Sequence, residues 1–133
     1  MRLVLDASAA VRLVMRAELA EQLLAPSAAA AVVIAPSLYA SEVASALWKY
    51  VRAGTLGTES ALDRYAEAID LIDDFTADLE LATEALSEAV RYGHPVYDLL
   101  YATLARRTGC GVLTLDQRLT TLLGHMGIPS VQI

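Results

Sequence analysis

The chain has 133 residues, of which 56% are hydrophobic and 20% are charged, and its formal net charge is -6. This composition excludes wholesale disorder, and the length suits one domain whose core needs neither disulfides nor a structural metal. The single cysteine, Cys110, excludes an intrachain disulfide and fits a reducing, cytoplasmic compartment. We therefore expect one domain over residues 1–133.

Short apolar runs alternate with longer segments of helical periodicity. In chain order, the first half predicts a strand at Arg2–Leu5, a helix at Ser8–Arg16 that extends toward Leu24, a strand at Val32–Ala35 and a helix at Leu38–Arg52. The second half predicts a helix at Thr58–Phe75, a strand at Asp78–Leu81, helices at Thr83–Tyr92 and Tyr97–Arg107, a strand at Val112–Leu115, a helix at Gln117–His125 and a strand at Val131–Ile133. This alternation is typical of an α/β fold, here a three-layer sandwich with a central, mostly parallel five-stranded sheet flanked by helices.

The longest uncharged stretch, from Gln22 to Ser41, is long enough to raise the question of a membrane span. Pro26 and Pro36 interrupt it, and we interpret it as loop, buried strand and helix start. The apolar run at the N-terminus is too short for the core of a signal peptide. We therefore expect no association with a membrane.

Four acids stand out because each lies in apolar surroundings. Asp6 and Asp116 each end an apolar run that is predicted to be a strand, and Glu42 and Asp98 lie in apolar, helix-like segments. A carboxylate in such a position is costly unless it has a partner. A hard divalent cation is a partner that all four could share.

The position of these acids suggests a common crevice. Ligands of parallel α/β sheets bind beyond the carboxyl ends of the strands, so Asp6 and Asp116 face the same crevice if the first and fourth strands are neighbours. Structural roles remain open, because Asp6 and Asp116 suit helix caps, Asp98 suits a first helical turn, and Glu42 suits an exposed helix face.

Two hydroxyls accompany the acids. Ser8 lies two residues after Asp6, and Thr114 lies two residues before Asp116. They are suited to orienting a carboxylate or a metal-bound water, or to capping. The histidines lack a Cys or His partner at ligand spacing, which argues against a zinc site.

Charge is unevenly distributed along the chain. The segment from Glu59 to Glu88 holds ten acids and one base, Arg64. The rest of the chain is therefore net basic, although it contains the four acids described above. This division predicts an acidic side and a basic side around a carboxylate cluster, and it is equally explained by two surface helices with acidic outer faces.

Four segments resemble motifs of the PIN-domain family: Val4–Ala9, Pro36–Leu47, Tyr97–Ala105 and Leu113–Leu119. Standalone domains of this size in that family are typically VapC-type toxins of toxin–antitoxin pairs. The resemblance implies a Mg²⁺- or Mn²⁺-dependent endoribonuclease that acts on RNA. It also implies a homodimer and inhibition by a cognate VapB-type antitoxin.

The acidic positions of the family fall on Asp6, Glu42, Asp98 and Asp116, and a further hydroxyl position fits Thr114. On this interpretation the three aspartates hold the metal, directly or through water, while Glu42 ligates it or orients the attacking water. Four bases near the motifs are expected to contact the RNA backbone: Arg12, Lys49, Arg52 and Arg118.

Two alternatives remain open. A receiver-like module also places an aspartate at a strand end, but such a module usually needs a second acid beside it and a lysine at a late strand end. Here Asp6 stands alone and the only lysine is Lys49. A PIN-like domain that has lost catalysis and only binds a partner is the other alternative, and a nuclease assay distinguishes it.

Overall fold

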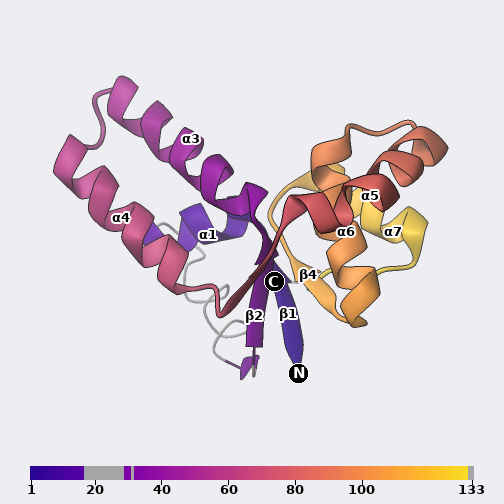
Figure 1. Cartoon of the computed structure of the whole chain (residues 1–133). Helices are drawn as coiled ribbons and strands as arrows, with labels where there is room; N and C mark the ends of the chain where they lie inside the picture. Colours follow the sequence, from indigo (N-terminus) through magenta and orange to yellow (C-terminus); the bar gives the residue numbers. More distant parts are fainter. Residues whose placement is uncertain (17–28, 31, 132–133) are drawn as a thin grey trace.

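A computed structural model of the chain describes residues 1–16, 29–30 and 32–131. The strands within these residues form one parallel sheet in the order β3-β2-β1-β4 (Figure 1). They are β1 (Arg2–Leu5), β2 (Val32–Pro36), β3 (Asp74–Thr76) and β4 (Gly111–Leu113). Strands β1 and β4 are neighbours, and a shared crevice at Asp6 and Asp116 requires this adjacency.

The helices cover the sheet from two sides, which confirms the predicted three-layer α/β architecture. Helices α1, α3 and α4 lie on one side of the strands, and α5, α6 and α7 lie on the other (Figure 1). Their bounds are α1 (Ala7–Val14), α3 (Leu38–Arg52), α4 (Thr58–Asp70), α5 (Asp78–Tyr92), α6 (Val96–Thr108) and α7 (Gln117–Met126).

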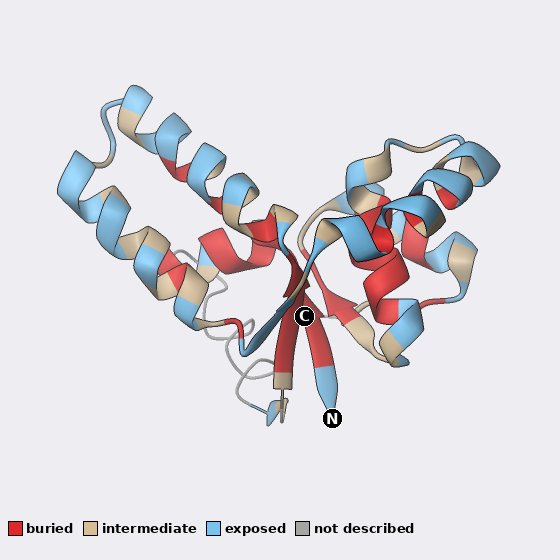
Figure 2. Ribbon diagram, in the orientation of Figure 1, coloured by how far each residue is buried: buried red, intermediate tan, exposed pale blue. Residues whose placement is uncertain are grey.

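The middle of the sheet is apolar on both faces because helices cover both. Leu3, Val4 and Leu5 of β1 are all buried, as is every residue of α6 from Leu99 to Ala105. Figure 2 shows buried residues along the strands and the adjoining helices, whereas the far ends of α3 and α4 are largely exposed. A continuous apolar run is the expected sequence of such a central parallel strand.

The register of β1 against β4 sets the position of the two strand-end acids. Leu3 is paired with Gly111 and Leu5 with Leu113. The amide of Asp6 then donates to the carbonyl of Leu113 at 3.1 Å. The chain therefore leaves β1 and β4 at the same edge of the sheet.

The described part of the sheet has four strands instead of the predicted five. The expected last strand, Val131–Ile133, falls mostly outside the described residues. Ser130 forms an isolated parallel bridge with Val112, and the amide of Val131 donates to the carbonyl of Val112 at 2.9 Å. Gly111 suits this close approach, because a Cβ at that position would lie 3.0 Å from the carbonyl oxygen of Pro129.

The predicted boundaries are wrong in the middle of the chain. Helix α4 ends at Asp70, five residues before the expected Phe75, and the third strand is β3 rather than Asp78–Leu81. The segment 78–81 is instead the first turn of α5. The predicted extension of the first helix toward Leu24 lies outside the described residues, and α1 itself ends at Val14.

Several acids of the segment from Glu59 to Glu88 have partners within the fold. A carboxylate oxygen of Asp73 accepts from the amide of Val33 at 2.7 Å. Glu84 accepts from Arg106 at 3.0 Å and from Arg107 at 3.1 Å, and these contacts join α5 to α6. The acidic segment is therefore partly structural and not only a solvated face.

Among the described residues, no helix has the length and apolar character needed to cross a bilayer. The stretch from Gln22 to Ser41 contributes β2 and the beginning of α3, and residues 22–28 and 31 of it lie outside the described part of the chain.

Candidate active site

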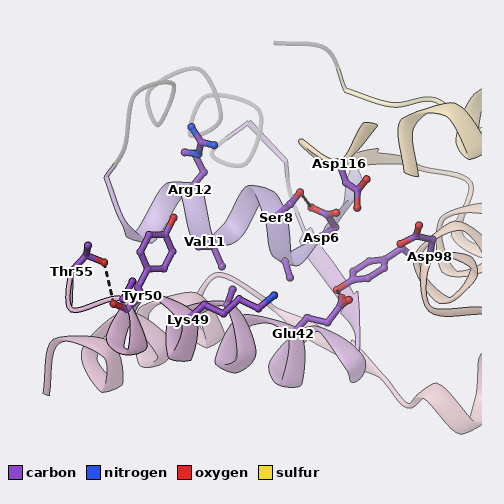
Figure 3. Close-up of a pocket in the computed structure, with 14 residues that line it drawn as sticks. Asp6, Ser8, Val11, Arg12, Glu42, Lys49, Tyr50, Thr55, Asp98 and Asp116 are labelled. Carbon is purple, nitrogen blue, oxygen red and sulfur yellow. Dashed lines mark hydrogen bonds between the residues drawn. The ribbon is translucent and has the colours of Figure 1, made fainter. Parts of the chain in front are cut away.

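Four elements bring the four predicted acids to one cavity of about 620 Å³ (Figure 3). Asp6 follows β1 and caps α1, and Asp116 follows β4 and caps α7. Glu42 comes from the second turn of α3, and Asp98 from the first turn of α6. Residues that are more than a hundred positions apart in the chain therefore face the same hollow.

Asp6 is held by hydrogen bonds at both of its carboxylate oxygens. Oδ1 accepts from the Ser8 hydroxyl at 2.7 Å and from the Ala9 amide at 3.1 Å, and Oδ2 accepts from the Thr114 hydroxyl at 2.7 Å. The Ser8 hydroxyl in turn accepts from the amide of Leu115 at 3.0 Å. Both predicted supporting hydroxyls thus orient this carboxylate and link the ends of β1 and β4.

Burial is the main influence on the acidity of Asp6. The residue is only 5% exposed, and this desolvation raises the pKa of its carboxyl to about 6, with a smaller contribution from the negative charge of Asp116. The hydrogen bonds from Thr114, Ser8 and Ala9 act in the opposite direction because they stabilise the ionised form. A nearby cation would stabilise the ionised form of this carboxyl and so lower its pKa.

Glu42 is bonded to a tyrosine that no sequence motif singles out. The hydroxyl of Tyr101, a buried residue of α6, donates to Oε1 of Glu42 at 2.6 Å. Desolvation raises the pKa of Glu42, and the charges of Asp6, Asp98 and Asp116 raise it further, while the bond from Tyr101 lowers it. No local signal predicts this pair, because its members are 59 residues apart.

Asp98 forms a hydrogen bond with His94. From the sequence, we could say of His94 only that it lacks the neighbours of a zinc ligand. His94 Nε2 lies 2.7 Å from Asp98 Oδ2, and the two side chains are 16% and 22% exposed. The residues are four positions apart across the start of α6. That spacing is a signal from which the contact could have been proposed.

Asp116 is the N-cap of α7. Its Oδ1 accepts from the amide of Arg118 at 2.8 Å, and its own amide donates to the Thr114 hydroxyl at 2.9 Å. The capping role considered for Asp116 is therefore present, as it is for Asp6, and both residues still line the cavity. Structural and functional interpretations of these aspartates are compatible.

The carboxylates lack cationic partners among the described residues. No lysine or arginine in that part of the chain forms an ion pair with Asp6, Glu42 or Asp116, and Asp98 has only His94. Repulsion among the acids contributes to the raised pKa of Asp6 and of Glu42. A bound cation would relieve this repulsion.

The donor set suits a hard cation but does not form a closed cage. All four acids offer carboxylate oxygens, the ligands that Mg²⁺ and Mn²⁺ prefer. No group of three His, Cys, Asp or Glu side chains within residues 1–16, 29–30 and 32–131 is close enough to hold an ion unaided. Mg²⁺ is commonly bound by one or two carboxylates together with water and substrate phosphate, so the open arrangement fits that ion.

The predicted RNA-contacting bases are not all at the cavity. Arg12 and Lys49 line it, and in Figure 3 the Lys49 side chain extends along α3 toward Glu42. Arg52 instead lies over the ring of Trp48, 5.3 Å from its centroid. The backbone amide of Arg118 donates to Asp116, but the residue lines a second cavity instead of this one.

Comparison with known proteins identifies the family of the chain. The family model described as "PIN domain" matches residues 3–122. A curated relative, Ribonuclease VapC3 of Pyrobaculum aerophilum, is 34% identical over 121 residues, which are 90% of this chain and 92% of the relative.

Solved structures also resemble this chain in fold. The crystal structure of PAE2754 from Pyrobaculum aerophilum has a TM-score of 0.72 at 24% identity, covering 92% of this chain and 79% of that one. The crystal structure of VapC20 from Mycobacterium tuberculosis, described as a sarcin-ricin loop cleaving toxin, has a TM-score of 0.70 at 17% identity, covering 98% of this chain and 99% of that one.

Proposed function

This chain belongs to the PIN-domain family, and from that premise we propose that it is a metal-dependent endoribonuclease, the toxin of a toxin–antitoxin pair. The observation that supports this proposal most directly is the gathering of Asp6, Glu42, Asp98 and Asp116 around one cavity without a lysine or arginine paired to them among the described residues. A curated relative that covers most of the chain is named a ribonuclease. The receiver-like alternative is wrong, because the chain matches the PIN family over residues 3–122.

In this proposal Asp6, Asp98 and Asp116 hold Mg²⁺ or Mn²⁺. The bound ion would lower the pKa of a coordinated water and stabilise negative charge on the phosphoryl oxygens. Ser8 and Thr114 keep the Asp6 carboxylate in a fixed orientation through their hydrogen bonds, and His94 does the same for Asp98.

Glu42 is proposed to orient the attacking water and to accept its proton. Its raised pKa makes it a stronger base than a free glutamate, which brings it closer to the range suited to general base catalysis near neutral pH. The Tyr101 hydroxyl bonds one carboxylate oxygen and so fixes the direction of the other.

Arg12 and Lys49 are proposed to contact the RNA backbone, since both line the cavity and phosphate contacts position a nucleic acid. Arg52, stacked over the exposed Trp48, is proposed to contact nucleotides farther along the strand. Family membership further supports a homodimer and a VapB-type antitoxin as partners.

The test is cleavage of RNA by the purified protein. We expect cleavage with Mg²⁺ or Mn²⁺, its loss in EDTA, and its return when Mg²⁺ is restored. Asp98→Asn is expected to abolish cleavage, because it removes one charge from the site while preserving the side-chain shape.

Glu80→Gln is a matched control, because Glu80 is an exposed acid of α5 outside the cavity. Circular dichroism checks that both variants are folded. Full activity of Asp98→Asn would contradict the site assignment. A folded wild-type protein that cleaves no RNA with either metal would instead favour the catalytically silent alternative.

A further inference from the structure

A second, smaller cavity of about 370 Å³ lies beside the carboxylates. It is formed by one face of α7, by the end of α5 and by the connection from α5 to α6, and we refer to it as the α7 groove. Its polar and aromatic lining consists of Tyr92, His94, Gln117, Arg118, Thr121 and His125.

The α7 groove adjoins the carboxylate cavity through two direct links. His94 lines the groove and lies 2.7 Å from Asp98, which lines the cavity. Gln117 and Arg118 line the groove and directly follow Asp116, which also lines the cavity. The linings of the two hollows are therefore in direct contact at Asp98 and adjacent in the chain at Asp116.

Within the carboxylate cavity, the residues linked to the α7 groove lie at one end. In Figure 3, Asp98 and Asp116 lie at one end of the cavity, while Tyr50 and Thr55 lie at the other. The α7 groove is linked to the cavity at Asp98 and Asp116, whereas Lys49 lies along α3 on the other side of Glu42 from Asp98 (Figure 3).

The charge of the α7 groove is opposite to that of the carboxylate cluster. Arg118 is exposed, and neither it nor His125 forms an ion pair with any described residue. No aspartate or glutamate among the described residues lines the groove. Gln117, Thr121 and His125 are spaced four residues apart, so they present polar groups along one exposed face of α7.

We infer that the α7 groove binds the RNA strand on one side of the scissile phosphate, with Arg118 on a backbone phosphate and with Gln117 and His125 donating to the adjoining sugar-phosphate. This inference rests on the proposed ribonuclease function. An RNA strand that contacts both the α7 groove and Lys49 would have an internal phosphate at the carboxylates. Cleavage within the strand requires this placement.

The experiment compares a dinucleotide with a single-stranded RNA long enough to extend past both hollows. The double variant Arg118→Ala/His125→Ala is expected to raise KM for the long RNA about tenfold, because a hydrogen bond to a charged group contributes that much or more. The dinucleotide, which cannot occupy the groove while it is being cut, is expected to be affected much less. Alanine keeps the backbone amide that donates to Asp116.

Arg2→Ala is the charge-matched control, because Arg2 is exposed at the amino end of β1, at the opposite edge of the sheet. This variant is expected to leave KM unchanged for both the long RNA and the dinucleotide. The inference would be overturned if the double variant raised KM equally for the long RNA and the dinucleotide, or raised it for neither.

A binding measurement separates failure of this inference from failure of the proposed function. In a Glu42→Gln background with Mg²⁺, the affinity for the long RNA is measured against salt concentration. The double variant is expected to lower the slope of log K against log salt by about 0.7 for each phosphate of the single strand that the protein no longer neutralises. An unchanged slope overturns the groove assignment, even if the wild-type protein cleaves RNA. A lowered slope supports the groove, even if no cleavage is found.

Discussion

Asp6 serves the fold and the site with one side chain. It caps α1, accepts hydroxyl hydrogen bonds from Ser8 and Thr114, and lines the carboxylate cavity. Burial has raised its pKa from 3.8 to about 6. In the metal-free protein its ionised form is consequently a cost to folding at neutral pH.

The sign of the resulting pH dependence is opposite to that of a salt-bridged aspartate. Between the two pKa values the native state holds a proton on Asp6 and the unfolded state does not, so stability falls as pH rises through about 6. A shift of this size corresponds to about 3 kcal/mol in the free energy of unfolding. In EDTA at about pH 4, we expect the free energy of unfolding of Asp6→Asn to be close to that of the wild type. At about pH 7, we expect the variant to have the larger free energy of unfolding.

Urea unfolding of both proteins at the two pH values measures this difference. Taking the variant minus the wild type removes the contribution of every other titrating group that the substitution leaves unchanged. A difference that is the same at both pH values would show that burial does not raise the pKa of Asp6.

At the scale of elements, the beginnings of α3 and α5 stabilise each other. Oδ1 of Asp78 accepts from the amide of Leu38 at 3.0 Å, and the hydroxyl of Ser37 accepts from the amide of Asp78 at 3.0 Å. Each helix thus receives a partner for one of its first amides from the start of the other helix. This reciprocal pair lies immediately beyond β2 and β3 and fixes the start of the helix that carries Glu42.

Asp78→Ala is expected to lower the free energy of unfolding by about 1 kcal/mol, the usual effect of losing a helix cap. Urea denaturation measures it. The control is Glu80→Ala, which removes an acid from the same first turn of α5 where the side chain is exposed. If the free energy of unfolding falls equally in both variants, the effect is due to the helix dipole and not to the hydrogen bond with Leu38.

The same region shows which elements a sequence can predict. The bounds predicted for α3 are those observed, because Pro36 ends the preceding strand, Gly54 follows the helix, and the apolar spacing is regular. Strand β3 escapes prediction because it has only three residues, and Asp74 and Phe75 in it are exposed, so it lacks an apolar run. The pattern of segment 78–81 wrongly predicts a strand, although its aspartate begins a helix.

For the molecule as a whole, the carboxylate cluster is a concentration of negative charge with which no lysine or arginine of the described residues forms an ion pair. We expect Mg²⁺ to raise the melting temperature of the wild-type protein by several degrees, since a ligand at a hundred times its Kd stabilises the native state by about 2.7 kcal/mol. Differential scanning fluorimetry measures the shift, with sodium chloride at equal ionic strength as the control.

The increase should be smaller for Asp98→Asn and for Asp116→Asn. Equal stabilisation of these variants and of the wild type would place the ion elsewhere on the acidic surface, for example along α4 or α5.

The convergence of the site could be predicted only in part. The positions of Asp6 and Asp116 after apolar runs indicated strand ends, but their proximity depends on the pairing of β1 with β4, and no local pattern determines that pairing. Resemblance to the PIN-domain family supplied the remaining information. The contact of Tyr101 with Glu42 depends on how two helices pack against each other, and it became visible only in the structure.

The pairing of β1 with β4 also bears on when the protein can become active during its synthesis. Thr114 is 108 residues beyond the Asp6 carboxylate to which it donates, and Asp116 follows later still. A nascent chain on the ribosome therefore cannot assemble the four-acid cavity until residue 116 has been translated. Products that terminate before Asp116 would lack the fourth acid of the cavity and, under the proposed function, would not cleave RNA in the cell that makes them.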